Sequence, residues 1–235
     1  MEHAARIRPP VFEIGLKGYC WGADAVRLAV EADRLAAGLG VSVVFDPQAV
    51  DIPAVAAATS QILVFAQHMD PVAPGRGVGS VLAEALRDAG AVGTLLNHSE
   101  KPMALGDLRR AIERARATGL YTLVFADSPA EAAALAHLGP DIVLAEPPEL
   151  IATGVSAGNV MAGFVADTVA AVKAVDPEIL VMSGAGVNGP DDVERMIHLG
   201  LDGTGSSSGI LKAADPVAAM RLMLEAEARA WAATH

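Results

Sequence analysis

Short runs of hydrophobic residues alternate with longer amphipathic segments along the whole chain. The runs are almost continuously hydrophobic, which is typical of strands that are buried on both faces of a parallel sheet. They predict eight strands, at Val11–Gly15, Val41–Phe45, Ile62–Ala66, Val92–Leu96, Tyr121–Phe125, Ile142–Ala145, Ile179–Met182 and Gly203–Ser206. The last run is polar and rich in glycine, so its assignment as a strand depends on its place in the alternation.

The segments between these runs have the periodicity of amphipathic helices. Several begin at proline or at a capping Asp or Ser, and several end at glycine. The pattern predicts a helix that begins after Asp51, and helices at Ala23–Gly38, Gly79–Asp88, Leu105–Thr118, Pro129–Leu138, Phe164–Val175, Pro190–Leu199 and Pro216–Ala232. We expect the side chains of Asp51, Asp107, Ser128 and Asp215 to cap helix N-termini.

Strict alternation of strands and helices predicts an α/β protein. Eight such repeats in 235 residues favour a single (β/α)8 barrel domain over residues 1–235, with parallel strands inside and helices outside. A doubly wound open sheet is the competing architecture. No Ser/Gly tract, charge block or low-complexity segment divides the chain. In a barrel, the functional residues are expected where strands end and the following loops begin.

The net charge of the protein limits the classes of partner that it is expected to bind. A net charge of −11 and an isoelectric point near 4.9 argue against nucleic acid and against an anionic membrane, since either requires a basic face. We expect no membrane segment, because no hydrophobic run reaches the ~18 residues that a span needs, and no signal peptide. The single cysteine, Cys20, excludes an internal disulfide and a CxxC zinc motif, so a reducing cytoplasm is the expected location.

Candidate functional residues follow the predicted strands. Lys17 follows the first strand, His98 the fourth, and Glu146 the sixth, where two prolines stiffen the backbone after it. Gly/Ser loops follow the last two strands, where barrels commonly bind phosphate. Each feature alone also fits a purely structural role, such as a solvated lysine or a rigid turn. Together they match proton abstraction next to a carbonyl group on a phosphorylated substrate.

Five segments carry a resemblance to a known family. They are FAQHMD, GAVGTLLNHSE, AEPPELIATG, MSGAGVNGPDDV and GILKAADP. With them the chain resembles triosephosphate isomerase, in particular the short archaeal-type branch. The resemblance implies a TIM barrel that interconverts glyceraldehyde 3-phosphate and dihydroxyacetone phosphate, in a cytoplasmic homodimer or homotetramer. It also implies that no cofactor and no metal is needed, because His98 and Lys17 polarise the substrate.

The resemblance assigns roles to the residues at the strand ends. Lys17 matches the electrophilic lysine of the family, and His98 matches the histidine that acts as a neutral imidazole. Glu146 matches the base that moves the proton between two carbons. Glu100 matches the acidic residue beside the lysine, and Gly15 stands next to these groups as a supporting position.

Further positions match the groups that hold the substrate phosphate. Gly186, Ser207 and Ser208 match the phosphate-binding residues after the last two strands. Pro147 to Gly154 match the loop that closes over the substrate. Within this loop, Ala152 is expected near the phosphate, and Glu149 is not the base.

Some residues depart from the family pattern. Gly15 replaces an asparagine, and Val78 replaces a threonine, at two positions that meet across the family's dimer interface, so altered subunit contacts are expected. Ala152 replaces a glycine of the closing loop. At the eighth strand, Gly205 and Ser206 are expected to remove bulk and to add a hydroxyl near the phosphate.

These departures leave three functions open. The first is isomerisation of the triose phosphates. The second is the same chemistry on another substrate, such as a four-carbon ketose phosphate, in a wider site. The third is a barrel that binds a phosphorylated ligand without turnover. The presence of Lys17, His98 and Glu146 together favours catalysis, because a binding protein does not need a proton-transfer carboxylate.

Overall fold

The eight predicted strands are present and close into a barrel. The computed structural model describes residues 7–147, 158–184 and 186–235. All strand pairs in it are parallel, each strand pairs with the next, and β8 returns to pair with β1. The strands are β1 Val11–Gly15, β2 Ser42–Asp46, β3 Leu63–Ala66, β4 Gly93–Leu96, β5 Tyr121–Ala126, β6 Ile142–Ala145, β7 Leu180–Ser183 and β8 Gly203–Ser206. Because β8 closes on β1, the barrel is confirmed and an open sheet is excluded.

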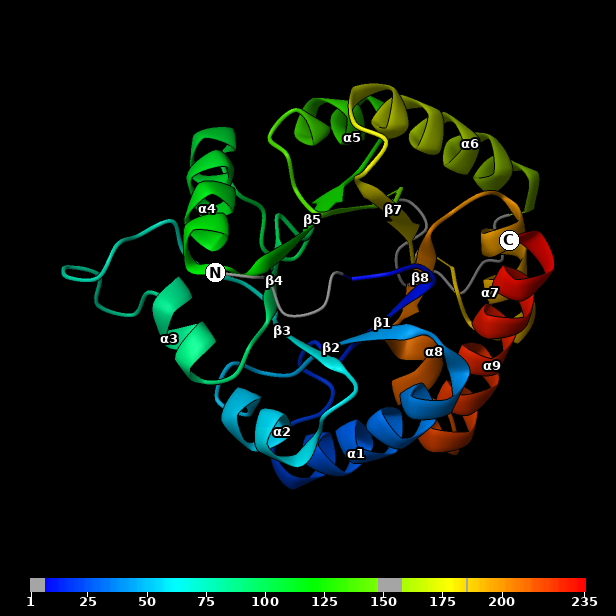
Figure 1. The fold of residues 1–235 in the computed structure, drawn as a ribbon, viewed down its shortest axis with the longest axis horizontal. Helices are drawn as coiled ribbons and strands as arrows, with labels where there is room; N and C mark the ends of the chain where they lie inside the picture. The colour runs from blue at the N-terminus through cyan, green and yellow to red at the C-terminus, as the bar shows by residue number, and fades with distance from the viewer. Residues whose placement is uncertain (1–6, 148–157, 185) are drawn as a thin grey trace.

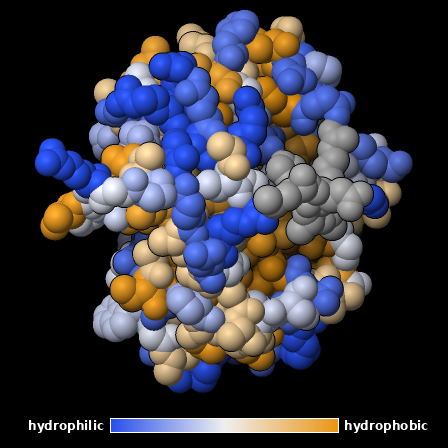
Figure 2. Space-filling view, turned by 60° about the vertical axis from the view of Figure 1, so that its left-hand side comes forward, coloured by the Kyte–Doolittle hydropathy of each residue, from blue (hydrophilic) through white to orange (hydrophobic). Residues whose placement is uncertain are grey.

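Helices surround the barrel on the outside (Figure 1). In the described residues they are α1 Gly22–Leu39, α2 Ile52–Ala58, α3 Ala83–Asp88, α4 Leu105–Thr118, α5 Pro129–Ala136, α6 Gly158–Val175, α7 Pro190–His198, α8 Ser208–Leu211 and α9 Pro216–Thr234. None of these helices combines the length and the hydrophobicity that crossing a bilayer requires. On the face that Figure 2 shows, hydrophobic and hydrophilic residues are interspersed.

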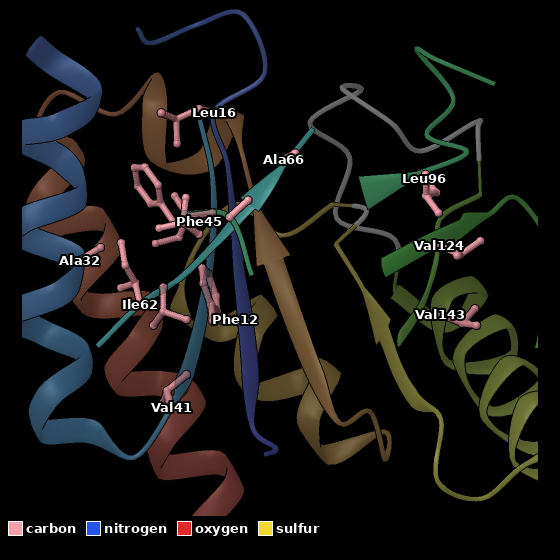
Figure 3. Close-up of a cluster of buried hydrophobic side chains, with 14 of the residues drawn as sticks. Phe12, Leu16, Ala32, Val41, Phe45, Ile62, Ala66, Leu96, Val124 and Val143 are labelled. Carbon is pink, nitrogen blue, oxygen red and sulfur yellow. The ribbon is translucent and has the colours of Figure 1, made fainter. Parts of the chain in front are cut away.

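Two hydrophobic layers hold the fold together. One fills the barrel and includes Val11, Val44 and Leu123. The other lies between the strands and the helices, where Phe12 of β1 and Phe45 of β2 pack against the outer helices (Figure 3). Because side chains alternate along a strand, residues 11, 13 and 15 of β1 face the barrel interior. An acidic residue at position 13 therefore points inward.

Two helix starts differ clearly from the prediction, and one short helix was not predicted. The helix predicted at Gly79–Asp88 begins only at Ala83. Gly79 has a φ of 82°, and the Val81 amide donates to Asp70 Oδ2 over 2.8 Å, so this stretch serves as the anchored end of a loop. In contrast, α6 begins at Gly158, before the predicted start, and the short helix α8 was not predicted.

The predicted helix caps are half right. Ser128 Oγ and Asp215 Oδ1 accept the amides of Glu131 and Ala218, as expected. Asp107 is instead a first-turn residue of α4, and its carboxylate pairs with Arg110. Asp51 stands at the N-cap position of α2, but its side chain makes no cap bond. Its Oδ2 accepts the amide of Gly22 over 2.9 Å, so it links two loops instead.

Candidate active site

A lysine and a glutamate join the loops after β1 and β4. Lys17 Nζ lies 2.7 Å from Glu100 Oε1, and the lysine side chain is only about a quarter exposed, at 27%. The hydrogen bond from this lysine lowers the pKa of Glu100. The pair brings Lys17 to the mouth of the barrel beside His98, as the sequence predicted for the strand ends.

The backbone at Lys17 is strained and firmly held. Its φ is 45°, in the left-handed region that non-glycine residues rarely adopt. The Lys17 carbonyl accepts the side-chain amides of Gln48 over 2.6 Å and of Gln67 over 3.0 Å. The Gln67 amide also donates to the carbonyl of Asp46. The side-chain amides of Gln48 and Gln67 therefore hold the backbone of Lys17 in place. The sequence pattern did not reveal this role of the two glutamines.

His98 is arranged as a neutral ring. Its Nδ1 accepts the backbone amide of Glu100 over 3.0 Å, so the proton of a neutral imidazole lies on Nε2. Burial lowers the pKa of His98 first, the Lys17 charge lowers it further, and Glu100 opposes them. The ring packs edge-on against Phe125, with 4.6 Å between the centroids. His98 can thus offer an N–H group without carrying a positive charge.

Glu146 follows β6, as predicted, and has the titration behaviour of a base. Its amide donates to the Ala126 carbonyl over 2.9 Å, which continues the pairing of β5 and β6. Burial is the first cause that raises the pKa of Glu146 to about 7. The Glu13 charge also raises this pKa, and the Lys17 charge lowers it. A carboxylate that titrates near neutral pH is well suited to general base catalysis.

Two further acids, Glu13 and Asp46, lie below Lys17 and were missed by the sequence analysis. Both are buried, and their side chains hydrogen-bond to each other. Burial raises the pKa of Glu13 well above its ordinary value, and raises that of Asp46 to about 6. The signal was present in the sequence, because each acid stands within or directly after a hydrophobic run. Within the described residues, no cluster of His, Cys, Asp and Glu is arranged to hold a metal ion.

The Glu13 carboxyl fills space that two glycines leave open. A Cβ at Gly15 would lie 2.6 Å from Glu13 Oε1, and a Cβ at Gly205 would lie 2.5 Å from Glu13 Oε2. The expectation that Gly205 widens the substrate site is therefore wrong, because Glu13 occupies the gap. Ser206 is also buried, and its hydroxyl donates to the Val187 carbonyl over 2.9 Å. It therefore faces the loop after β7 rather than a ligand.

The predicted phosphate-binding residues follow the adjacent strands β7 and β8. Gly186 has a φ of 75°, and its carbonyl accepts the Asn188 side-chain amide over 3.0 Å. Ser207 Oγ donates to the Gly15 carbonyl, and Ser208 begins α8. The first amides of a helix have no intrahelical acceptor. Pro147 is described, but Glu149, Ala152 and the rest of the loop to Gly154 lie outside the described residues.

Comparison with known proteins assigns the chain to a family. The family model described as triosephosphate isomerase matches residues 17–223. The chain belongs to the triosephosphate isomerase family. The resemblance seen in the sequence motifs is thus confirmed. The match begins at Lys17, so Glu13 and Gly15 stand before the matched segment.

Several archaeal proteins named triosephosphate isomerase are similar to this chain over most of their length. The protein of Pyrobaculum calidifontis is 41% identical, over 89% of this chain and 92% of its own. That of Methanothermobacter thermautotrophicus is 40% identical, over 88% and 91%. That of Methanothermus fervidus is 35% identical, over 92% and 97%. The similarity therefore extends along nearly the whole of each chain.

Proposed function

We propose that this protein interconverts glyceraldehyde 3-phosphate and dihydroxyacetone phosphate, with Glu146 as the base. It is an isomerase of the triosephosphate isomerase family. The observation that carries the assignment of the base is a carboxyl group at the end of β6 whose pKa is raised to about 7. Such a group is ionised often enough to accept a proton near pH 7, and basic enough to hold it.

The reaction is a proton transfer between two neighbouring carbons. Glu146 takes the proton from C2 of the aldehyde, and the electron pair moves through the C1–C2 bond onto the carbonyl oxygen. Glu146 then returns a proton to C1 of the resulting enediolate, and a ketone remains at C2. His98 Nε2–H and the Lys17 ammonium stabilise the developing oxygen charge, and His98 moves a proton between the two oxygens. A carboxylate base beside a neutral imidazole is the arrangement already known for this enzyme family.

The phosphate group of the substrate is held by backbone amides in this proposal. Gly186, Ser207 and Ser208 provide amides after β7 and β8, while Lys17 adds the positive charge. Oriented amide dipoles bind an anion even when the protein carries a net charge of −11. Screening at physiological ionic strength limits the opposing long-range repulsion to about 8 Å. Residue 152 belongs to the proposed closing loop.

An assay with both triose phosphates and a four-carbon ketose phosphate tests this function. We expect turnover of the trioses, and in D2O we expect solvent deuterium to enter C1 of dihydroxyacetone phosphate, since the proton passes through Glu146. Turnover of the four-carbon substrate alone, or phosphate binding without turnover, would contradict the proposal. The filled space at Gly205 removes the reason for expecting a wider site, so we put forward no second function.

We further propose a cytoplasmic homodimer or homotetramer, joined through the loop between β3 and α3. This loop projects from the barrel in Figure 1. Its end is anchored by two hydrogen bonds between Asp70 and Val81, while Val78 is fully exposed. A hydrophobic side chain on an anchored projection suits insertion into a second subunit. The free thiol of Cys20 fits a reducing compartment.

Light scattering after size exclusion tests this assembly. We expect Val78→Asp to lower the measured mass toward that of a monomer. Val50→Asp is the matched control, because Val50 is also exposed but lies outside this loop. An unchanged mass for Val78→Asp, or an equal loss for both variants, would contradict the proposed interface.

A further inference from the structure

Glu13 and Asp46 form a pair of carboxyl groups directly beneath the site. They come from neighbouring strands, β1 and β2, whose register sets Gly15 opposite Asp46. Asp46 Oδ1 accepts the Leu16 amide over 3.1 Å, which ties the pair to the loop that carries Lys17. Asp46 Oδ2 is buried and receives no hydrogen bond from an N–H or hydroxyl group of the described residues, while the Asp46 side chain hydrogen-bonds to that of Glu13. Two buried carboxyls in contact hold one proton between them, because like charges at this distance cannot both ionise.

The same pair approaches Glu146. A Cβ at Gly184 would lie 3.0 Å from Glu146 Oε1 and 3.2 Å from the Gly205 carbonyl oxygen. A Cβ at Gly205 would lie 2.5 Å from Glu13 Oε2. The carboxyl groups of Glu13 and Glu146 therefore border the same short stretch of β7 and β8. Because residues 15 and 205 are glycines, the Glu13 carboxyl fits into the space that a side chain at either position would occupy.

We propose that Glu13 is a positioning residue for the isomerisation: it shares one proton and one negative charge with Asp46, and through that charge it acts on Glu146 across the ends of β7 and β8. This inference rests on the proposed function, because it takes Glu146 as the base. Glu13 would act through Glu146 and not through contact with the substrate. Neither the position of Glu13 nor that of Gly15 lies within the residues that match the family model.

The charges around Glu146 support this role. Glu13 of β1 and Glu100 after β4 raise its pKa, and Lys17 after β1 lowers it. Asp46 of β2 and Lys17 face Glu13. Lys17 itself is already paired with Glu100. The acids thus outnumber this cation, and after burial, the charge of Glu13 is the largest cause of the raised pKa of Glu146.

Two isosteric variants should move the activity profile in opposite directions. Glu13→Gln keeps a hydrogen-bond donor for Asp46 and confines the negative charge of the pair to Asp46 on β2. No charge then remains at position 13, so Glu146 should lose its proton at lower pH. Asp46→Asn keeps an acceptor for the Leu16 amide and offers its side-chain N–H to Glu13. That change confines the charge of the pair to Glu13, so Glu146 should lose its proton at higher pH. A general disturbance of the structure would not shift the deprotonation of Glu146 to lower pH in one variant and to higher pH in the other.

The test is the pH dependence of kcat/KM for the parent and both variants, between pH 5 and 9. We expect the midpoint of the acid limb to fall by about one pH unit in Glu13→Gln and to rise in Asp46→Asn. At the upper plateau, Glu13→Gln should retain activity within about threefold, because the base is intact. Equal midpoints in parent and Glu13→Gln, or a shift of both variants in one direction, would overturn the inference.

A second readout does not depend on activity. Carbon NMR of labelled glutamate carboxyls follows Glu146 directly in the free protein, and Glu146→Gln identifies its signal. The pKa of Glu146 should fall in Glu13→Gln and should rise in Asp46→Asn. If one variant does not fold, the direction in which the pKa of Glu146 shifts in the other variant still tests the inference. Full activity of Glu146→Gln would reject Glu146 as the base, which is a failure of the proposed function. If Glu146→Gln is inactive but the titration of Glu146 is unmoved in Glu13→Gln, only the role of Glu13 is rejected.

Discussion

Two buried glutamates near β8 have raised pKa values for different reasons. Glu227 of α9 is completely buried against β8, where the Thr204 amide donates over 3.3 Å and the Thr204 hydroxyl over 2.9 Å. Burial raises the pKa of Glu227 to about 8, and these two hydrogen bonds oppose the increase. Glu146 reaches about 7, and three charged side chains contribute to its value. One acid has hydrogen-bonding neighbours, and the other has charged neighbours.

The difference shows which property marks a reactive acid. Desolvation is the first cause for both groups, so a raised pKa alone does not locate an active site. Glu227 is held on the outer side of a strand and has no route to a substrate at the barrel mouth. Glu146 stands at a strand end, where Lys17, Glu13 and Glu100 respond to each other's charge. Position at the strand ends, together with coupled charges, distinguishes the two.

Substitution of the two glutamates should separate catalysis from stability. Glu146→Asp draws the carboxylate back by about one methylene, and a misplacement of about 1 Å can reduce kcat roughly 10²-fold. Glu146→Gln removes the base, and should cost up to about 10⁴-fold. Glu227→Gln should leave kcat within a few-fold of the parent. Steady-state kinetics with glyceraldehyde 3-phosphate measures all three.

The control for this comparison is the fold of each variant. Circular dichroism should show that both Glu146 variants melt close to the parent temperature at pH 7. A folded Glu227→Gln protein that has lost turnover would make Glu227 part of the chemistry, and the distinction between the two acids would fail.

A new negative charge after β8 should weaken substrate binding through the phosphate. In Ser207→Asp a carboxylate replaces the hydroxyl that donates to the Gly15 carbonyl, and it repels an anion on this side of the mouth. We expect KM to rise roughly 10- to 100-fold. Ser207→Ala is the matched control, since it removes the same hydrogen bond without adding charge. Equal KM values for both variants would mean that the phosphate binds elsewhere.

Glu227 should make stability fall as the pH rises. Its folded-state pKa of about 8 lies above the ordinary value of 4.5, so the folded state binds the proton more tightly. The contribution is complete below pH 4.5 and is lost as the pH rises toward about 8, with a slope near 1.4 kcal/mol per pH unit. Urea unfolding at several pH values should show a flatter profile for Glu227→Gln than for the parent. Parallel profiles would mean that Glu227 does not keep its proton in the folded state.

His98 should show no titration in the range where Glu146 titrates. Burial and the Lys17 charge lower the pKa of His98, so the ring should remain neutral between about pH 6 and 9. Nitrogen NMR of the imidazole should report one protonated nitrogen, Nε2, throughout. A protonated ring near neutral pH would contradict the assignment of His98 as a neutral hydrogen-bond donor. The site would then hold two positive charges, on His98 and on Lys17.

The strands could be predicted because burial on two faces leaves a plain hydrophobic signature. The start of α3 could not, because the pairing of Asp70 with Val81 is a tertiary contact that overrides the local helix signal. The short α8 consists of Ser208–Leu211, which is too few residues to show helical periodicity.

The proposed site could be predicted from the sequence where it uses residues at strand ends. Lys17, His98 and Glu146 could be selected because the barrel directs these ends to one face. Glu13 was visible as an acid within a hydrophobic run, but the inward direction of its side chain cannot be known without the barrel register. The fit of Glu13 to Gly205 depends on contact between β1 and β8, the two most distant strands in the sequence. For the same reason, the sequence analysis mistook a filled space for an open one.

The left-handed backbone at Lys17 lowers the stability of the folded protein, although the proposed activity needs a lysine at this position. Lysine at a φ of 45° costs on the order of 1–2 kcal/mol, whereas glycine adopts this conformation without that cost. A Lys17→Gly protein should consequently be harder to unfold than the parent, although it would lack the cation at the mouth. A lysine at such a backbone angle is consistent with the proposed role of its ammonium group at the mouth of the barrel.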